Sequence, residues 1–182
     1  MGTFTHDDDL IMILPALQAV CERHDAVELQ IIGALGQEAT ADALGKLPVR
    51  IMGPTQEETA YPLFMLWFTS RIRWDIGISP LRENLFNKCK SDIKFLDYSA
   101  IGAAGIYSQG PAYESGVQHA LTGLLVENSV GAWEGALEML LTDDGLRMQI
   151  AGNAARNLCE HRTLAHSARH WLSALEELLE GA

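Results

Sequence analysis

Short apolar runs alternate with longer segments of mixed polarity along most of the chain. Apolar runs of about four to eight residues, bounded by loops, are typical of strands buried on both faces of a parallel sheet. Such runs occur at 26–33, 49–53, 75–81, 103–108 and 122–127. Alternating strands and helices predict an α/β fold, here a Rossmann-like, doubly wound parallel sheet with helices on both faces.

The segments between and after these runs have apolar residues at helical spacing. After the acidic start, apolar residues between positions 10 and 21 recur at helical intervals, with Asp7 as the expected N-cap. The other expected helices lie within 54–71, over 87–101 and from 130 onward, the last over about 164–179. No internal repeat or break in composition divides the chain. We therefore predict a single domain, 1–182, whose helical C-terminal tail packs back on the sheet.

Charge and cysteine usage argue against several classes of protein. The formal net charge of −11 argues against nucleic-acid binding, which needs a clustered basic surface. Cys21, Cys89 and Cys159 are far apart and form no CxxC pair, which predicts a reduced, cytoplasmic protein. No apolar run approaches the roughly 18 residues that span a bilayer. The polar start MGTFTHDDDL does not have the pattern of a signal peptide.

Ligands of doubly wound folds bind at the carboxyl ends of the strands. We therefore expect the site among the loops that follow the strands, at 3–8, 33–37, 53–58, 82–91 and 109–114.

The segment RENLFNKCKSDIKFLDYSAIG contains the strongest candidate site. Lys88, Lys90 and Lys94 cluster in an otherwise acidic chain, and Ser91 is placed to cap the helix that follows. A helix start with free N–H groups and nearby ammonium groups binds anions such as phosphate. Asp97 lies about two turns beyond Lys90, where a carboxylate can accept hydrogen bonds from the vicinal hydroxyls of a ribose. The alternative is a solvated lysine-rich loop with Asp97 on a helix surface.

A second candidate contact lies in the loop that opens the chain. Gly2 allows close approach of the backbone, and Thr3, Thr5 and His6 offer hydrogen-bond donors for a phosphate or a sugar. The alternative is a simple capped helix start.

The sequence predicts no metal site and no catalytic residue. The run from His6 to Asp9 places adjacent side chains in different directions on a helix, which does not suit metal ligation. His166 and His170 are four apart but have no carboxylate partner in register. No GxSxG elbow and no GxxxxGK[ST] loop occurs.

Three segments together carry a resemblance to a known family. They are DIGISPLRENLFNKCKSDIKFLDYSAIGAAGIYS, GVQHALTGLLVEN and AWEGALEMLLTDDGLRMQIAGNAARNL. With these segments the chain resembles, over almost its whole length, the C-terminal, nucleotide-sugar-binding domain of the GT-B glycosyltransferases of the retaining group-1 family.

The resemblance implies one half of a GT-B fold, which holds the nucleoside diphosphate of a nucleotide sugar as substrate. Such enzymes, here of the hexosyltransferase type and typical of polysaccharide biosynthesis, need no cofactor and no obligatory metal. Transfer occurs in a cleft shared with an acceptor-binding N-terminal domain of the same parent protein. The resemblance further implies that this chain lacks that domain and most of its own first strand. It would then be inactive alone, and any contact with the inner membrane would be made through the missing domain.

The family's motif has two glutamates separated by seven residues, and only part of it is present. The second glutamate, which holds the ribose, falls on Asp97, whereas the first falls on Cys89, which cannot replace a carboxylate. The donor-binding residues that the resemblance implies are Gly2, Thr3, Lys90, Ser91, Lys94 and Asp97.

Two other functions stay open on the sequence. Cys89 and the missing half are compatible with a non-catalytic interaction module that keeps the fold. An unrelated α/β enzyme, such as a sugar-nucleotide epimerase or a small hydrolase, has no supporting motif.

Overall fold

The computed structural model describes residues 6–33 and 38–180. Within them, each of the five expected strands is present inside its predicted range. The strands are β1 (Leu29–Ile32), β2 (Val49–Met52), β3 (Ile76–Ser79), β4 (Ala104–Ser108) and β5 (Leu124–Val126). All pairs between them are parallel.

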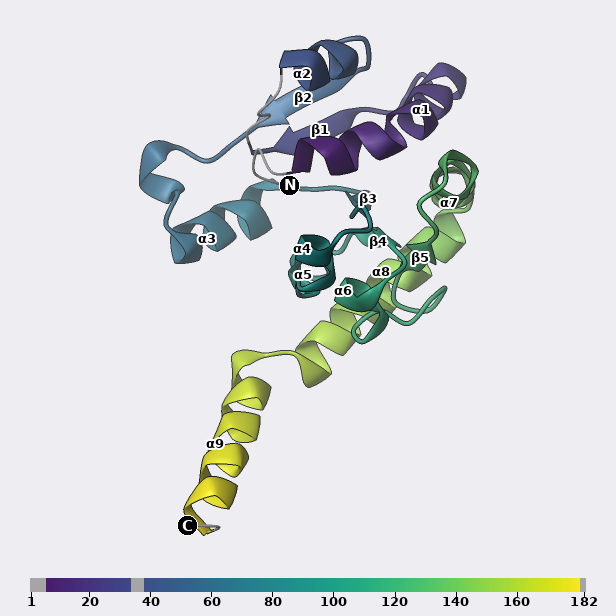
Figure 1. The fold of residues 1–182 in the computed structure, drawn as a ribbon. Helices are drawn as coiled ribbons and strands as arrows, with labels where there is room; N and C mark the ends of the chain where they lie inside the picture. Colours follow the sequence, from purple (N-terminus) through teal and green to yellow (C-terminus); the bar gives the residue numbers. More distant parts are fainter. Residues whose placement is uncertain (1–5, 34–37, 181–182) are drawn as a thin grey trace.

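These strands form two sheets, not the single sheet that the sequence predicts (Figure 1). One sheet pairs β1 with β2, and the other has the order β3-β4-β5. In the first, Leu29 is opposite Val49, and in the second, Ile76 is opposite Ala104. β1 and β3 do not pair with each other, and their segments line opposite sides of a cavity between the two sheets.

Helices cover both faces of the three-stranded sheet, as a doubly wound fold requires. The longer helices are α1 (Asp7–Arg23), α3 (Tyr61–Arg71), α5 (Ile93–Ile101), α7 (Val130–Thr142), α8 (Asp144–His161) and α9 (Leu164–Glu180). The shorter ones are α2 (Glu38–Leu44), α4 (Leu85–Lys88), α6 (Pro111–Glu114) and the 3-10 turn η2 (Gln56–Glu58). The helix expected over 87–101 is therefore two helices with a turn between them. His6, and not Asp7, is the N-cap of α1.

Strand β4 is the centre of the hydrophobic core, and all of its residues are buried. Successive side chains of a strand point to opposite faces. Ala104 and Ile106 accordingly join a cluster with α1 and α7 that contains Trp133, whereas Tyr107 joins a second cluster with Tyr98 of α5. The amphipathic pattern of the helices thus builds one apolar layer on each side of β4.

The C-terminal tail behaves in two different ways. Helix α8 packs on α5 and β4, as the sequence predicts. Helix α9 does not pack on the sheet, contrary to the prediction. It extends away from the rest of the fold (Figure 1), and none of its residues is buried. It nevertheless carries an apolar stripe at helical spacing. The large exposed side chains of this stripe are Leu164, Trp171, Leu172, Leu175, Leu178 and Leu179.

No helix in the described part of the chain is both long and apolar enough to cross a bilayer.

Candidate functional site

A buried carboxylate, Asp9, fixes the start of α1 against the loop after β3. Its Oδ1 accepts hydrogen bonds from the backbone N–H of Arg82 at 2.7 Å and from Nδ2 of Asn87 at 3.1 Å. Its Oδ2 lies 2.9 Å from Nδ1 of His6. Burial by itself would raise the pKa of Asp9, but the hydrogen bonds from His6 and Arg82 lower it below its usual value. Asp9 therefore positions His6 beside the turn between α4 and α5.

Lys90 meets His6 at this turn. Its Nζ lies 3.4 Å from Nε2 of His6 and 5.0 Å from the centre of the Phe86 ring. Burial lowers the pKa of Lys90, and the nearby ammonium of Lys94 lowers it further, against the attraction of Asp9. Two cations that lie close enough to disfavour each other are stabilised when an anion binds between them.

Lys94 also pairs with Asp97 one turn further along α5. Their Nζ and Oδ2 atoms are 3.1 Å apart, and their side chains are 18% and 3% exposed. Burial raises the pKa of Asp97, and Lys94 opposes this effect. The carboxylate of Asp97 and the ammonium groups of Lys90 and Lys94 therefore form one cluster. Asp97 is buried in it and does not lie on an exposed helix surface.

The N-terminus of α5 is not capped in the way that the sequence predicts. The N-cap residue is Asp92, and Ser91, the expected cap, is exposed just before it. The Asp92 carboxylate makes no capping hydrogen bond because Arg162, beyond the end of α8, holds both of its oxygens at 2.8 and 2.9 Å. The N–H of Phe95 donates to the Asp92 carbonyl at 2.8 Å. The N–H groups of Ile93 and Lys94, which precede it in the first turn of α5, are suited to bind an anion.

The structure brings together some of the predicted residues and not others. Lys90, Lys94 and Asp97 form one cluster, which His6 joins. Lys88 does not join it, because it is exposed and pairs with Glu83 at 2.8 Å. The predicted contacts Gly2 and Thr3 lie outside the described residues.

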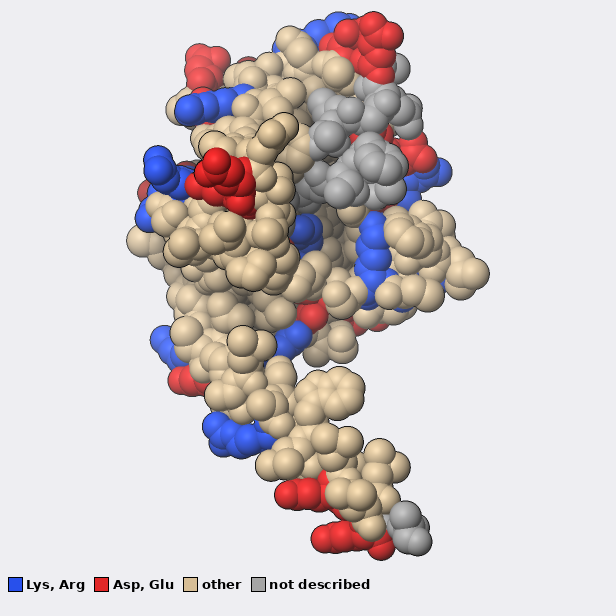
Figure 2. Space-filling model, turned by 90° about the vertical axis from the view of Figure 1, so that its left-hand side faces the viewer, with Lys and Arg blue, Asp and Glu red and all other residues tan. Residues whose placement is uncertain are grey.

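The sequence offered His6 as a donor in the opening loop, but it did not predict the roles of Asp9 and Asn87 in this arrangement. The spacing of three between His6 and Asp9, which makes them neighbours on a helix, was the one local signal for the pair. Figure 2 shows one face of the molecule, on which separate groups of Lys and Arg atoms in blue lie beside a hollow between two protruding parts of the surface.

A cavity of about 580 Å³ lies at the carboxyl ends of β3, β4 and β5, and it is lined by Asn87 and Lys88 but not by Lys90, Lys94 or Asp97. A hydrogen-bonded chain ties the three strand ends together. The hydroxyl of Ser108 accepts from the N–H of Leu81 at 2.7 Å and bonds Oδ1 of Asn128 at 2.6 Å, and Nδ2 of Asn128 donates to the Leu81 carbonyl at 2.8 Å. The cavity is also lined by the polar side chains of Arg82 and Gln109. Such walls suit a ligand rich in hydroxyl groups.

The residues that the structure describes contain no group of three His, Cys, Asp or Glu side chains placed to hold a metal ion. Cys89 is exposed at the C-cap of α4.

No protein-family profile matches the chain, and no curated protein has a significantly similar sequence. Solved structures are similar to it in fold at low sequence identity. The C-terminal domain of a group 1 glycosyl transferase family protein, LpcC of Francisella tularensis, has a TM-score of 0.70 at 16% identity, over 90% of this chain and 84% of that one. A glycosyltransferase from Rickettsia africae has a TM-score of 0.74 at 14% identity, over 100% of this chain and 46% of that one.

The chain has the fold of the C-terminal domain of GT-B glycosyltransferases. HepE of Anabaena, solved in complex with UDP, gives a TM-score of 0.73 at 10% identity, over 97% of this chain and 47% of HepE. This GT-B-type domain therefore spans about half the length of the full glycosyltransferases that it matches. In the doubly wound class, the crevice at the carboxyl ends of the strands is the usual ligand site, and the cavity of about 580 Å³ lies there.

Proposed function

We propose that this chain is the donor-binding domain of a glycosyltransferase that transfers a sugar, of the hexosyl type, from a nucleoside diphosphate sugar to an acceptor. One observation carries the proposal: the buried Asp97–Lys94 pair, together with Lys90, adjoins the uncapped start of α5. A nucleoside diphosphate carries both the diol and the anion that such a cluster recognises.

The chemistry of the cluster assigns its parts. Asp97 is an acceptor-only carboxylate when ionised, so it accepts hydrogen bonds from the ribose hydroxyls. Lys90, Lys94 and the first-turn N–H groups of α5 neutralise the diphosphate, with the exposed hydroxyl of Ser91 as a further donor. Gly2 and Thr3 stay predicted contacts of the same diphosphate.

Calorimetry with UDP, GDP, ADP and their sugars at millimolar concentration tests the proposal. UDP comes first because the HepE structures hold UDP and UDP-glucose. We expect saturable binding of at least one nucleotide. Absence of binding by all of them would overturn the proposal.

A pair of aspartate variants separates ribose recognition from general anion binding. Asp97→Ala should weaken nucleotide binding by about 1.5–3 kcal/mol, roughly 10- to 150-fold, through loss of a charge-assisted hydrogen bond. It should leave pyrophosphate binding unchanged or tighter, because the Lys94 ammonium is released from its partner. Asp144→Ala removes an exposed carboxylate at the start of α8 and is the matched control. Equal losses for nucleotide and pyrophosphate would contradict the role of Asp97.

Sugar transfer would further need an acceptor-binding domain, because catalysis in a two-domain cleft depends on positioning both substrates. Two observations support such a partner. The chain spans 46% and 47% of two full glycosyltransferases, and the apolar stripe of α9 is exposed. We expect this chain alone to bind the donor without transferring its sugar, as measured by release of nucleotide with and without acceptor.

A non-catalytic interaction module is the second candidate function, and Cys89 favours it. An exposed thiol stands where the family's sugar-facing carboxylate is expected. Cys89→Glu distinguishes the two candidates by calorimetry. It should tighten binding of a nucleotide sugar relative to the free nucleotide if the donor subsite is otherwise intact. No effect of any nucleotide on the melting temperature, with co-purification of a partner protein, would favour the module.

A further inference from the structure

An ion pair between Asp92 and Arg162 joins the start of α5 to the end of α8. Nη1 of Arg162 lies 2.8 Å from Oδ2 of Asp92, and its Nη2 lies 2.9 Å from Oδ1. A two-point contact between a guanidinium and a carboxylate is one of the stronger ion pairs in proteins. The side chain of Asp92 is 13% exposed and that of Arg162 is 32% exposed, so water screens the pair only in part.

The surroundings of this pair hold the Asp92 carboxylate in one place. A side chain at Gly116, in the loop after α6, would collide with Oδ2 of Asp92 and would also contact Nη1 of Arg162. Burial raises the pKa of Tyr113 in α6 to about 12, and the negative charge of Asp92 contributes to this shift. The carboxylate therefore lies toward α6 and the loop after it, and it makes no capping bond to α5.

Other helices of the chain show what a polar side chain does at the same position. Asn84, Ser129 and Asp143 are the N-caps of α4, α7 and α8, and each side chain accepts a hydrogen bond from the backbone N–H three residues ahead. Asp143 is the same type of residue as Asp92, and its capping bond is 2.8 Å long. Asp92 differs from Asp143 in that Arg162 holds its carboxylate.

A carboxylate released from Arg162 would compete with an anion bound at the start of α5. The side chain of an N-cap residue accepts from the second or third N–H of its helix, which in α5 are those of Lys94 and Phe95. Its negative charge would also lie at the helix N-terminus, where the helix dipole attracts anions. A diphosphate at this position would then meet an occupied donor and a like charge.

We propose that Arg162 is a positioning residue for the diphosphate of the nucleotide. It holds the Asp92 carboxylate away from the first turn of α5, which leaves the N–H groups of this turn and the Lys90 ammonium for the anion. Arg162 acts through Asp92 and makes no contact with the ligand. The inference rests on the proposed function, because it concerns the same site.

Calorimetry of the full chain with inorganic pyrophosphate and with UDP tests the inference. Arg162→Ala should weaken binding of both probes by a similar factor, about 5- to 30-fold, because a carboxylate cap then competes for the N–H groups of α5. Asp97→Ala, in contrast, should weaken the binding of UDP and not that of pyrophosphate. Arg162→Lys keeps the positive charge without the two-point contact, so it should lose less affinity than Arg162→Ala.

A second substitution separates this role from a purely structural one. In the double variant Arg162→Ala, Asp92→Ala the competing carboxylate is absent, and the net charge is that of the parent. This variant should bind both probes within about twofold of the parent. An ion pair that serves only to anchor α8 on α5 would give no such rescue, because the anchor is also broken in the double variant.

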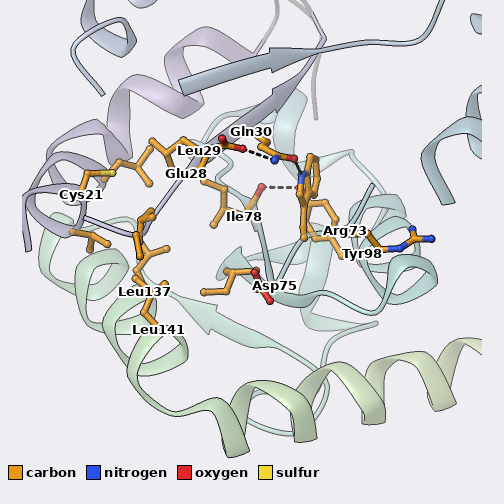
Figure 3. Close-up of a pocket in the computed structure, with 16 residues that line it drawn as sticks. Cys21, Glu28, Leu29, Gln30, Arg73, Asp75, Ile78, Tyr98, Leu137 and Leu141 are labelled. Atoms are coloured by element: carbon orange, nitrogen blue, oxygen red, sulfur yellow. Dashed lines mark hydrogen bonds between the residues drawn. The ribbon is translucent and has the colours of Figure 1, made fainter. Parts of the chain in front are cut away.

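Arg73→Ala is the matched control for the loss of one positive charge. Arg73 lies beside the cavity of about 280 Å³ between the two sheets, and Figure 3 shows its guanidinium pointing away from that cavity. It donates to the backbone carbonyls of Thr69 and Ile72. Its removal should leave the affinities for pyrophosphate and UDP unchanged.

Hydrogen exchange tests the restraint on Asp92 without any ligand. In Arg162→Ala, exchange at the N–H of Lys94 or Phe95 should slow by at least about threefold, because the released carboxylate accepts a hydrogen bond there. The double variant should exchange at the rate of the parent.

Two results would overturn the inference. The first is an unchanged affinity of Arg162→Ala for both probes, and the second is a loss of affinity that Asp92→Ala does not restore. A parent that binds pyrophosphate and no nucleotide would overturn the proposed function, whereas the pyrophosphate affinities would still decide the role of Arg162. Binding of neither pyrophosphate nor any nucleotide would overturn both.

Discussion

Every residue of β4, at the centre of the three-stranded sheet, is buried, whereas no residue of β2, in the two-stranded sheet, is. The difference comes from what covers each sheet. Helices α1, α7, α8 and α5 cover the first, and a small cluster of Ile32, Phe68 and Ile72 supports the second. Both sheets are parallel, but only the first is enclosed in the way that parallel sheets normally require.

The proposed nucleotide site belongs to the enclosed sheet and depends on its rigidity. Asp97 and Lys94 are on α5, which packs on β4 and α8. A site on packed elements holds its geometry better than one on loosely supported strands. The contrast between the two sheets therefore predicts where mutations change stability and where they do not.

The largest effect is expected in the enclosed half. Trp133→Ala removes the largest fully buried side chain and should lower the free energy of unfolding by about 3–5 kcal/mol. Urea denaturation measures this change. Trp133→Phe is the control and should cost much less, because the indole Nε1 has no hydrogen-bond partner among the residues described. Equal losses for the two variants would show that packing around the ring is not the cause.

A smaller effect is expected where α1 meets the loop after β3. Asp9→Ala leaves the N–H of Arg82 and the amide of Asn87 without their carboxylate acceptor. We expect a loss of about 2–3 kcal/mol, since buried donors that lose a charged partner are costly. Asp8→Ala, which removes an exposed partner of Arg82, is the matched control and should cost well under about 1 kcal/mol.

The two buried carboxylates should respond oppositely to pH. The pKa of Asp9 is lowered in the fold, so its contribution to stability is present above its ordinary pKa of 3.8 and is lost as the pH falls through the folded pKa. The pKa of Asp97 is raised, so its contribution is present below 3.8 and is lost as the pH rises through its folded value. The unfolding free energy of Asp9→Asn relative to the parent should therefore change mainly below about pH 4, and that of Asp97→Asn mainly above about pH 4, in opposite directions as the pH rises. Parallel changes would contradict the assignment.

The smallest effect is expected in the two-stranded sheet. Ile51 of β2 is 62% exposed, so Ile51→Ala should change the free energy of unfolding by no more than about 0.5 kcal/mol. Ile106→Ala in β4, which is fully buried, is the matched substitution and should cost about 2–5 kcal/mol. Similar costs at the two positions would remove the contrast between the sheets.

Local pattern was a good guide to the elements and a partial guide to the site. All five strands lie within their predicted ranges, although apolar runs correspond to full burial in β4 and not in β2. The Lys94–Asp97 pair also follows from sequence, since residues three apart on a helix are neighbours. The prediction of one continuous helix over 87–101 was wrong, because a turn at Cys89 separates α4 from α5.

Local sequence pattern did not predict the contacts between residues that are far apart in the chain. Ser91 suits an N-cap by its residue type, but Asp92 occupies that position and its side chain is held by Arg162, 70 residues away. Asp9 similarly has its main partner, the N–H of Arg82, 73 residues away.

The sequence by itself determined the α/β class, the strands, the acidic surface and the spacing that pairs Lys94 with Asp97, because each depends on residues close together in the chain. Only the tertiary structure decided that β1 and β3 line a cavity between two sheets, that Asp9 anchors His6 beside Lys90, and that α9 stays exposed. These features depend on which surfaces meet after the chain has folded. The free energy of these contacts comes from burial and hydrogen bonding between secondary-structure elements, and the local spacing of residues in the sequence does not predict it.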